Sequence, residues 1–177
     1  APKYHQKLQD QNKMFVRDRI DYLLDPNSFV EDGLLARSLD DLPADAVITG
    51  YGKIDGRPVA IIANDMTVKA GTWGRVTYQK MTHTQLRADK MGIPIIYLVD
   101  SAGARLDEQQ YCYAGRNAMG NIFHNQIQIS GRVPQICVLF GPSPAGSAYV
   151  PALCDITIMV DKNVSAYLGS PRMAEMV

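Results

Sequence analysis

Two apolar runs that flank a segment of small residues dominate the hydrophobic pattern of this chain. Residues 133–140 form one run, which ends in a loop with two prolines and two glycines, and residues 156–160 form the other. Strands that are apolar on both faces are typical of a parallel or otherwise covered sheet. Between the runs, residues 145–148 are predicted to open a short helix that Asp155 closes. A glycine there lets a ligand approach bare backbone N–H groups, although small residues at such turns commonly serve only close packing.

The first 45 residues are predicted to form a helical lead-in. Residues 2–24 fit one helix, strongest from Asn12 onward, with its apolar side chains on a single face. The acidic stretch 29–45 is expected to be an exposed connection. Residues 46–177 then form the predicted core, which we expect to be incomplete at its carboxyl end because the chain stops inside a helical pattern.

A hairpin and repeated helix–strand units follow the lead-in. Asp55 and Gly56 lie between two apolar strands, and both tolerate the positive φ of a tight hairpin turn. A flexible glycine-containing turn is expected at 67–74, and beyond it helices and strands alternate. The predicted strands are 46–52, 57–64, 93–99, 133–140, 156–160 and 163–168, and the predicted longer helices are 75–91 and 116–130, with Met119, Ile122, Phe123 and Ile127 inward. This order of elements predicts an α/β fold.

Composition narrows the range of partners and compartments. The 18 basic and 18 acidic side chains balance, so nothing in the charge suggests nucleic acid or a membrane surface as a partner. The three cysteines form no CxxC pair and suggest no metal site. Cys137 and Cys154 lie in apolar stretches and are interpreted as buried thiols, which favours a reducing compartment, hence the cytoplasm or, in a eukaryote, the mitochondrial matrix. No apolar segment approaches the ~20 residues of a membrane span, and no signal peptide opens the chain.

Two small-residue turns carry the candidate chemistry. Residues 101–104 and 145–148 each follow a buried strand and precede a predicted helix. If the two strands are neighbours in a parallel sheet, both turns lie at its carboxyl edge, where ligands bind in such folds. One backbone N–H group from each turn could then converge on a carbonyl oxygen. A donor of this kind contributes roughly 3–4 kcal/mol when the negative charge exists only in the transition state.

Four stretches of the chain match one known family, in the family's order, and together they cover nearly all of residues 15–177. They are RDRIDYLLDPNSFVE (17–31), GYGKIDGRPVAIIANDMTVKAGTWG (50–74), IYLVDSAGARLDEQ (96–109) and VPQICVLFGPSPAGSAYVPALCDITIMV (133–160). The chain resembles the carboxyltransferase (beta) subunits of biotin-dependent acyl-CoA carboxylases of the propionyl-CoA and methylcrotonyl-CoA type, which belong to the crotonase superfamily. The resemblance implies a crotonase-like α/β fold of repeated β-β-α units.

The resemblance also implies roles for residues in the turns. The backbone N–H groups of Ala102, Gly146 and Ser147 would form an oxyanion hole for the thioester oxygen of acyl-CoA. Five further residues would border the acyl-CoA or keep the site open: Gly71, Thr72, Gly103, Ala104 and Ala145. The family usually has two glycines where this chain has Gly146 and Ser147. A backbone donor survives that change, but the serine side chain narrows the pocket.

The implied reaction is carboxyl transfer between carboxybiotin and the α-carbon of an acyl-CoA. The hole would stabilise the thioester enolate, and the biotin ureido nitrogen would accept the proton, so the chain needs neither a side-chain base nor a metal. Biotin would be carried by a partner, which implies biotin carboxylase and biotin carrier subunits. The family also has a second, carboxyl-terminal crotonase-like domain that completes the site across the interface of a homo-oligomer. Because that domain lies outside this chain, we expect the chain alone to be inactive.

Alternative interpretations remain at this stage. The chain could belong to a sodium-pumping acyl-CoA decarboxylase, which uses the same hole in the reverse direction, or to a non-catalytic CoA-binding or scaffold subunit. Ser147 could be a nucleophile, as in ClpP-like peptidases, but such a serine needs a base, and all three histidines precede it. Three residues after the first turn could contact CoA phosphates or order the site: Arg105, Asp107 and Glu108.

The remaining candidates lie around the 67–74 turn. Lys69, Arg75 and Lys80 could meet the CoA diphosphate, although a scattered basic face is the preferred interpretation. Trp73 could stack on adenine, but a lone tryptophan is more often part of a core or an interface.

Overall fold

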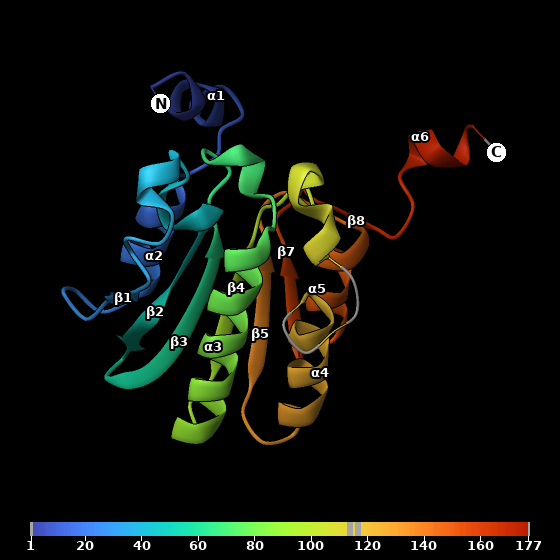
Figure 1. Ribbon diagram of the computed structural model, residues 1–177. Coiled ribbons are helices and arrows are strands. Elements are labelled where there is room, and N and C mark those ends of the chain that lie inside the picture. The colour runs from blue at the N-terminus through green and yellow to red at the C-terminus, as the bar shows by residue number, and fades with distance from the viewer. Residues whose placement is uncertain (1, 113–114, 116–117, 177) are drawn as a thin grey trace.

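A six-stranded mixed sheet forms the centre of the molecule. The structure is a computed structural model that describes residues 2–112, 115 and 118–176. The strand order is β1-β2-β3-β4-β5-β7, antiparallel from β1 to β3 and parallel from β3 to β7 (Figure 1). The strands are β1 (Val30–Asp32), β2 (Val47–Ile54), β3 (Arg57–Asn64), β4 (Ile95–Val99), β5 (Gln135–Leu139) and β7 (Ile156–Met159), and β6 (Pro142–Pro144) pairs with β8 (Ser165–Tyr167) in a small parallel sheet. The predicted α/β class is confirmed.

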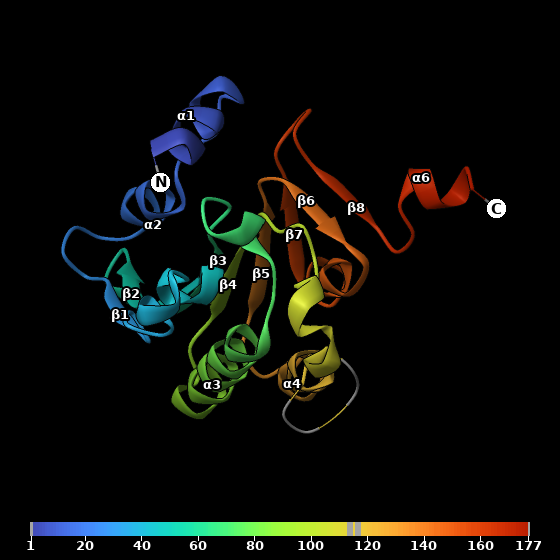
Figure 2. The same cartoon turned by 45° about the horizontal axis from the view of Figure 1, so that its top comes forward.

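Helices cover both faces of this sheet. The α-helices are α1 (Pro2–Asp10), α2 (Val16–Leu23), α3 (Arg75–Met91), α4 (Gly120–Ile129), α5 (Tyr149–Ala152) and α6 (Pro171–Ala174). Short 3-10 helices are η1 (Ser38–Asp40), η2 (Pro43–Ala46), η3 (Lys69–Gly71), η4 (Leu106–Tyr111) and η5 (Ala145–Ala148). Figures 1 and 2 show α3 and α4 side by side on one face, α2 beside β2 and β3, and α6 projecting away from the body.

Two apolar clusters bind these layers together. The larger one joins α3, α4 and α5 to the sheet and contains Trp73, Tyr78 and Ile122. The smaller one packs Val16 and Ile20 of α2 against the opposite face of β2, β3 and β4. Because alternate side chains of a strand point to opposite faces, strands covered in this way are apolar on both sides. The continuous apolar run of β4, all five residues of which are buried, follows from this position.

The predicted hairpin and the predicted end of the first long helix are both confirmed. Asp55 and Gly56 turn the chain between β2 and β3 with φ of 49° and 78°. Both of their backbone N–H groups donate to the Asp25 carboxylate, at 2.9 and 2.8 Å, which fixes the turn to the lead-in. Helix α3 ends at Gly92, which takes the left-handed conformation expected of a helix C-cap.

The lead-in differs from its prediction in two ways. The single helix expected at 2–24 is two helices, and Asn12 between them has a φ of 51°. The break directs Lys13 to the carboxyl end of β4, a long-range contact that helical periodicity does not reveal. The stretch 29–45 is not merely an exposed connection, since it adds β1 to the sheet and places Asp45 at 0% exposure.

The second half of the chain shows two further differences. Of the expected helix 116–130, residues 120–129 form α4, whereas 116 and 117 lie outside the described residues. Ile122 faces the core, but Ile127 is 58% exposed, so its inward prediction is wrong. The run 156–160 forms β7 as expected, yet all four residues of β7 are exposed. This strand is the edge of the sheet, and no described helix packs over both of its faces.

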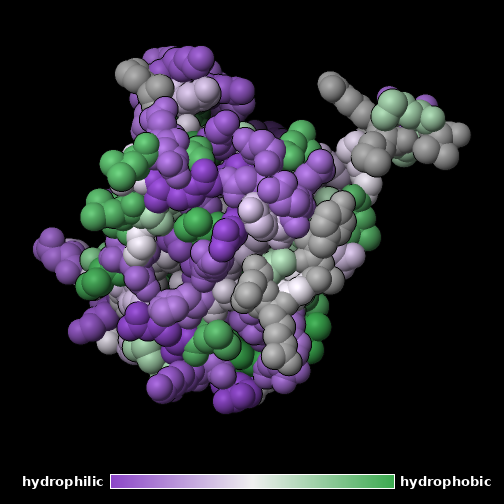
Figure 3. Space-filling view, viewed as in Figure 1, coloured by the Kyte–Doolittle hydropathy of each residue, from purple (hydrophilic) through white to green (hydrophobic). Residues whose placement is uncertain are grey.

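The surface carries scattered apolar patches. Figure 3 shows a largely hydrophilic face with hydrophobic patches on the left, over the lead-in segment. Exposed apolar side chains of that segment include Leu34, Leu35 and Leu39. Among the helices of the described chain, none has the length and hydrophobicity to cross a membrane.

Candidate functional site

The two small-residue turns lie next to each other at the carboxyl edge of the sheet. Strands β4 and β5 are parallel neighbours, paired from Ile95 with Gln135 to Val99 with Leu139. The Ser101 N–H group donates to the Pro142 carbonyl at 2.9 Å. A Cβ atom on Gly103 would lie 3.2 Å from Pro144 Cγ. The adjacency expected from the sequence is confirmed.

A third turn, at residues 69–73, runs along the first one. The Trp73 N–H group donates to the Gly103 carbonyl at 2.9 Å, and the Arg105 N–H group donates to the Trp73 carbonyl at 2.8 Å. The Ser101 hydroxyl donates to the Gly71 carbonyl at 2.7 Å. These bonds form a short parallel ladder between the two turns, centred on Trp73 and Ala104. Turn 101–104 therefore has fixed backbone neighbours on both sides.

The ladder determines which N–H groups of the first turn are available. The Ala102 N–H group donates to the Ala70 carbonyl at 3.0 Å, and the Gly103 N–H group donates to the Ser101 hydroxyl at 3.1 Å. The Ala104 N–H group has no acceptor among the described residues, and Ala104 is exposed. Ala102 could serve an oxyanion only by giving up its bond to Ala70, whereas Ala104 can donate without rearrangement.

A cleft of about 770 Å³ opens in front of these turns. It is lined by Tyr4, Lys69, Ala70, Thr72, Ala102, Ala104, Arg105, Leu106 and Asp107. Three of the candidate residues therefore border it directly, namely Thr72, Ala102 and Ala104. Gly71 and Gly103 are buried behind its wall. The candidates of the second turn, Ala145, Gly146 and Ser147, are not part of this lining.

Met119 occupies the space in front of Gly146. A Cβ atom on Gly146 would lie 2.7 Å from Met119 Sδ and 2.8 Å from Met119 Cε. The glycine thus leaves room for a flexible thioether against the backbone of η5. Beside it, the rings of Phe123 and Tyr149 are in contact, with centroids 5.1 Å apart. The sequence predicted Met119 to face inward but did not indicate this contact, because Gly146 lies on a distant segment.

The side chain of Ser147 has a structural role. Ser147 is 1% exposed, and its hydroxyl donates to the Pro144 carbonyl at 2.7 Å. Its own carbonyl accepts a bond from the Ser143 hydroxyl at 2.9 Å. No bond in the described part of the chain joins Ser147 to a histidine. This arrangement stabilises the 142–147 loop and does not activate a nucleophile.

Buried ion pairs hold the amino-terminal end of the first turn. Asp100, which is fully buried, accepts bonds from Lys13 at 3.1 and 3.3 Å and from Arg19 at 3.2 Å. The Arg19 guanidinium also lies over the Phe140 ring, 4.2 Å from its centroid. Burial lowers the pKa of Arg19, and the Asp100 carboxylate raises it. The lead-in is therefore attached through its charges to the ends of β4 and β5.

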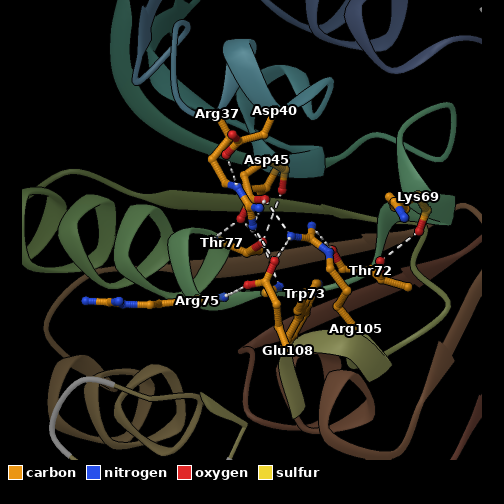
Figure 4. A network of polar contacts seen from close by, with 12 residues as sticks. Arg37, Asp40, Asp45, Lys69, Thr72, Trp73, Arg75, Thr77, Arg105 and Glu108 are labelled. Atoms are coloured by element: carbon orange, nitrogen blue, oxygen red, sulfur yellow. Dashed lines mark hydrogen bonds and ion pairs between the residues drawn. The ribbon is translucent and has the colours of Figure 1, made fainter. Parts of the chain in front are cut away.

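A second charge network holds the carboxyl-terminal end of the turn (Figure 4). The Arg105 guanidinium, 3% exposed, donates to Asp45 at 2.6 Å, to Glu108 at 3.0 Å and to the Thr72 carbonyl at 3.0 Å. Arg37 of the lead-in donates to Glu108 as well. Of the two roles considered for Arg105, contact with phosphate or ordering of the site, the inward position of its side chain favours ordering.

Glu108 is the meeting point of three donors in this network. Burial alone raises the pKa of its carboxyl group, but the Arg75 N–H group and the guanidinium groups of Arg37 and Arg105 together lower that pKa to about 2. The Arg75 N–H group belongs to the first turn of α3 and donates to Glu108 at 2.8 Å. Glu108 therefore caps α3 while binding the network that holds the turn.

Glu108→Gln is expected to lower the free energy of unfolding by about 1–3 kcal/mol at pH 7, because charge-assisted bonds are lost. The pKa of Glu108 lies below its ordinary value of 4.5. Its carboxylate therefore contributes stability above about pH 4.5, and this contribution is lost as the pH falls toward 2. The variant should lose less stability than the wild type over that range in urea unfolding followed by tryptophan fluorescence. Asp107→Asn, at the exposed neighbouring position, is the control, and identical acid profiles of Glu108→Gln and wild type would contradict the assignment.

The basic residues around the 69–73 turn do not form one face. Lys69 is exposed and borders the cleft. The Arg75 side chain points away from the network in Figure 4. Lys80 is buried and donates to the carbonyls of Ala44 and Val47, and burial lowers its pKa to about 8. The prediction that these residues form a scattered, exposed basic face is therefore wrong for Lys80. Trp73, at 1% exposure, belongs to the core, as the preferred interpretation held.

Gly71→Ala is expected to lower the free energy of unfolding by about 2–3 kcal/mol. Gly71 has a φ of +65°, and a Cβ atom there would overlap the Asp100 carbonyl oxygen. Gly56→Ala is the matched control, since Gly56 has a φ of +78° but no atom within 4 Å of the added Cβ. The control should show only the left-handed backbone cost of about 1–2 kcal/mol. Equal losses in urea unfolding would show that the 69–73 turn can move away from β4.

Metal binding has no visible basis in the described residues. They contain no cluster of three His, Cys, Asp or Glu side chains that could hold an ion. The two turns themselves offer backbone donors and small side chains, and the open cleft lies in front of turns 69–73 and 101–104.

Known proteins share this arrangement of sequence and fold. The chain is 55% identical over its full length to an uncharacterized carboxylase, YngE, of Bacillus subtilis, and covers 35% of that protein. It is 40% identical, over 98% of its length, to the mitochondrial methylcrotonoyl-CoA carboxylase beta chain of Dictyostelium discoideum, of which it covers 30%. The chain thus spans about a third of the length of the relatives it matches.

The structural comparison agrees with the sequence comparison. A crystal structure of transcarboxylase 12S, with hydrolyzed methylmalonyl-coenzyme A bound, superposes with a TM-score of 0.88 at 34% identity, covering 98% of this chain and 35% of that one. This confirms the predicted crotonase-like fold. The model of the carboxyl transferase domain family matches residues 7–177. On all three grounds, the chain belongs to the carboxyl transferase domain family, as its sequence predicted.

Proposed function

We propose that this chain is the amino-terminal part of a carboxyltransferase that moves a carboxyl group between carboxybiotin and the α-carbon of an acyl-CoA. The observation that supports it most is that turn 101–104 lines an open cleft and contacts the loop that leads into the second small-residue turn. One turn offers the Ala104 N–H group, for which the described residues provide no acceptor, and the other contains Gly146 and Ser147. Such donors stabilise the oxygen of a thioester as negative charge develops on it.

The chain's own groups bind and polarise the substrate in this mechanism. The N–H groups of Ala104 and of Gly146 or Ser147 donate to the thioester oxygen and lower the free energy of the enolate that forms when the α-proton leaves. Ala102 lines the cleft beside them. Its small side chain leaves space for the thioester. Neither a side-chain base nor a metal is required, since the proton passes to the biotin substrate.

The remaining part of the site belongs to other chains or segments in this proposal. The chain spans about a third of its relatives, so the carboxybiotin pocket is assigned to a carboxyl-terminal carboxyltransferase domain. Biotin is delivered by a carrier subunit that a biotin carboxylase subunit charges. A homo-oligomer joins the two halves of the site, and the transcarboxylase 12S structure is described as a hexamer assembly.

The test is acyl-CoA binding and carboxyl transfer. Calorimetry with acetyl-, propionyl- and methylmalonyl-CoA, with free CoA as control, should show saturable binding to the complete subunit that contains this chain. Transfer of labelled carboxyl from carboxybiotin to the tightest-binding acyl-CoA should follow. A reaction that runs only from acyl-CoA to biotin and depends on sodium would favour the decarboxylase alternative. Absence of both binding and transfer would favour a scaffold subunit and overturn the proposal.

A further inference from the structure

We propose that Arg105 is a positioning residue for the acyl-CoA cleft, an inference that rests on the function proposed above. Its guanidinium group fastens turn 101–104 to turn 69–73 and to the lead-in. The Ala104 N–H group is thereby held at a fixed place in the wall of the cleft. Arg105 acts through the backbone of these turns and does not itself hold the reacting thioester.

The contacts of Arg105 support this role because they join three segments that are distant in sequence. Its Nη2 donates to the Thr72 carbonyl, and its backbone N–H group donates to the Trp73 carbonyl. Its Nη1 donates to Asp45 of the lead-in. One residue thus bonds twice to the 69–73 turn and once to η2. A planar guanidinium can make these bonds in different directions at once, which a lysine ammonium does less well.

The conformation around Asp45 is a second, independent observation. Ala44, Asp45 and Ala46 all have left-handed backbones, with φ of 54°, 54° and 61°. Non-glycine residues in this region cost about 1–2 kcal/mol each, and such strain persists only where the surroundings enforce it. Here the strained segment directs a fully buried carboxylate at Arg105 and at the Thr77 N–H group, at 2.6 Å each. The fold therefore stabilises an unfavourable backbone in order to place this anion.

The consequence for catalysis follows from the geometry of the ladder. Ala104 lies directly before Arg105 and opposite Trp73 in the ladder. If the guanidinium is removed, the turn loses its side-chain bonds to Asp45 and to the Thr72 carbonyl, and Ala104 is held mainly by the backbone bonds of the ladder. A displacement of about 1 Å in a catalytic donor is enough to reduce a rate about 100-fold. Because the loss falls on a donor that acts in the transition state, kcat is expected to fall while KM changes little.

The experiment compares Arg105→Met with Arg132→Met in the complete subunit. The Arg132 side chain is 64% exposed and pairs with the partly buried Asp89 at 3.3 Å, so its replacement removes an ion pair without touching the turns. We expect Arg105→Met to lower kcat about 10- to 100-fold with KM changed less than about 3-fold. Hydrogen exchange should become faster in peptides spanning 69–76 and 100–106. Arg132→Met should change none of these, and Arg105→Lys should give intermediate values.

A double variant keeps the test decisive if the single change prevents folding. Arg105→Met leaves Asp45 buried without its main cation, which is destabilising. Asp45→Asn combined with Arg105→Met removes both charges and should fold, while still freeing the turn. Its exchange and kinetic changes should match those predicted for Arg105→Met.

The outcomes separate the two proposals. Faster exchange together with reduced kcat supports the positioning role. Unchanged exchange, or faster exchange with unchanged kcat per folded enzyme, overturns it. If the wild-type subunit shows no carboxyl transfer at all, the proposed function fails. The exchange arm then still decides whether Arg105 holds the turn, because it does not depend on activity.

Discussion

Asp100→Ala is expected to lower the free energy of unfolding by about 3–5 kcal/mol, the largest effect of any single change considered for stability. The Asp100 carboxylate is 0% exposed to solvent, and it is paired with the cationic side chains of Lys13 and Arg19. The side chains of these two cations are only 9% and 5% exposed. Removal of the shared anion leaves both charges buried and unpaired, and that desolvation penalty is what makes such changes costly.

Urea unfolding monitored by the fluorescence of Trp73, the single tryptophan of the chain, measures this effect. Arg132→Met is the control, because its pair with Asp89, in which the Arg132 side chain is 64% exposed, should contribute no more than about 1 kcal/mol. A triple replacement (Lys13→Met, Arg19→Leu, Asp100→Leu) should recover most of the loss, since apolar residues of similar volume can replace a buried ion cluster. A loss below about 1 kcal/mol for Asp100→Ala would show that water reaches the carboxylate and that the cluster does not anchor the lead-in.

Local sequence signals predicted the parts of this fold that depend on neighbours in the chain. Asp55 and Gly56 identified the hairpin, and Gly92 marked the end of α3, because backbone conformation at these positions is set by the residues themselves. The adjacency of the two small-residue turns could also be predicted. It follows from two consecutive buried strands in a parallel sheet, whose carboxyl ends share one edge.

The charge networks could not be predicted in the same way. Asp45 and Arg105 are 60 positions apart, and Lys13 and Asp100 are 87 apart. Their pairing depends on how the lead-in returns to the sheet, which periodicity does not encode. An acidic stretch is ordinarily solvated, so nothing local distinguishes the buried Asp45 from the exposed Asp40 and Asp41. Asp100 is different, because a charged residue directly after a fully apolar strand is noticeable in the sequence, although its partners are not.

Which N–H group of turn 101–104 is free to donate could not be predicted from the sequence, for a different reason. Ala102 and Ala104 are equivalent in size and both border the cleft. Only the hydrogen bond from Ala102 to the Ala70 carbonyl separates them. Sequence resemblance pointed to this turn, and in the proposed mechanism the accounting of backbone partners favours Ala104 over Ala102 as the donor.

Gly146→Pro is expected to lower kcat for carboxyl transfer about 100- to 1000-fold in the complete subunit, which corresponds to about 2.7–4 kcal/mol of transition-state stabilisation. Proline has no N–H group, so the variant removes one of the donors proposed for the thioester oxygen. The affinity for acyl-CoA, measured by calorimetry, should change far less, because the lost interaction strengthens only as the enolate forms.

Gly146→Ala is the control that separates the N–H group from the added bulk. Both variants place a Cβ atom against Met119, whose Sδ and Cε atoms lie at the end of a flexible side chain and can move. Only proline also removes the donor, and it restricts Ala145, which has a φ of 49°. Alanine should therefore retain kcat within about 10-fold, and Ser147→Pro should resemble Gly146→Pro if both N–H groups serve the oxygen. Equal losses in Gly146→Ala and Gly146→Pro would mean that the space occupied by Met119, and not the backbone donor, limits the reaction, and the oxyanion hole would then have to be assigned elsewhere.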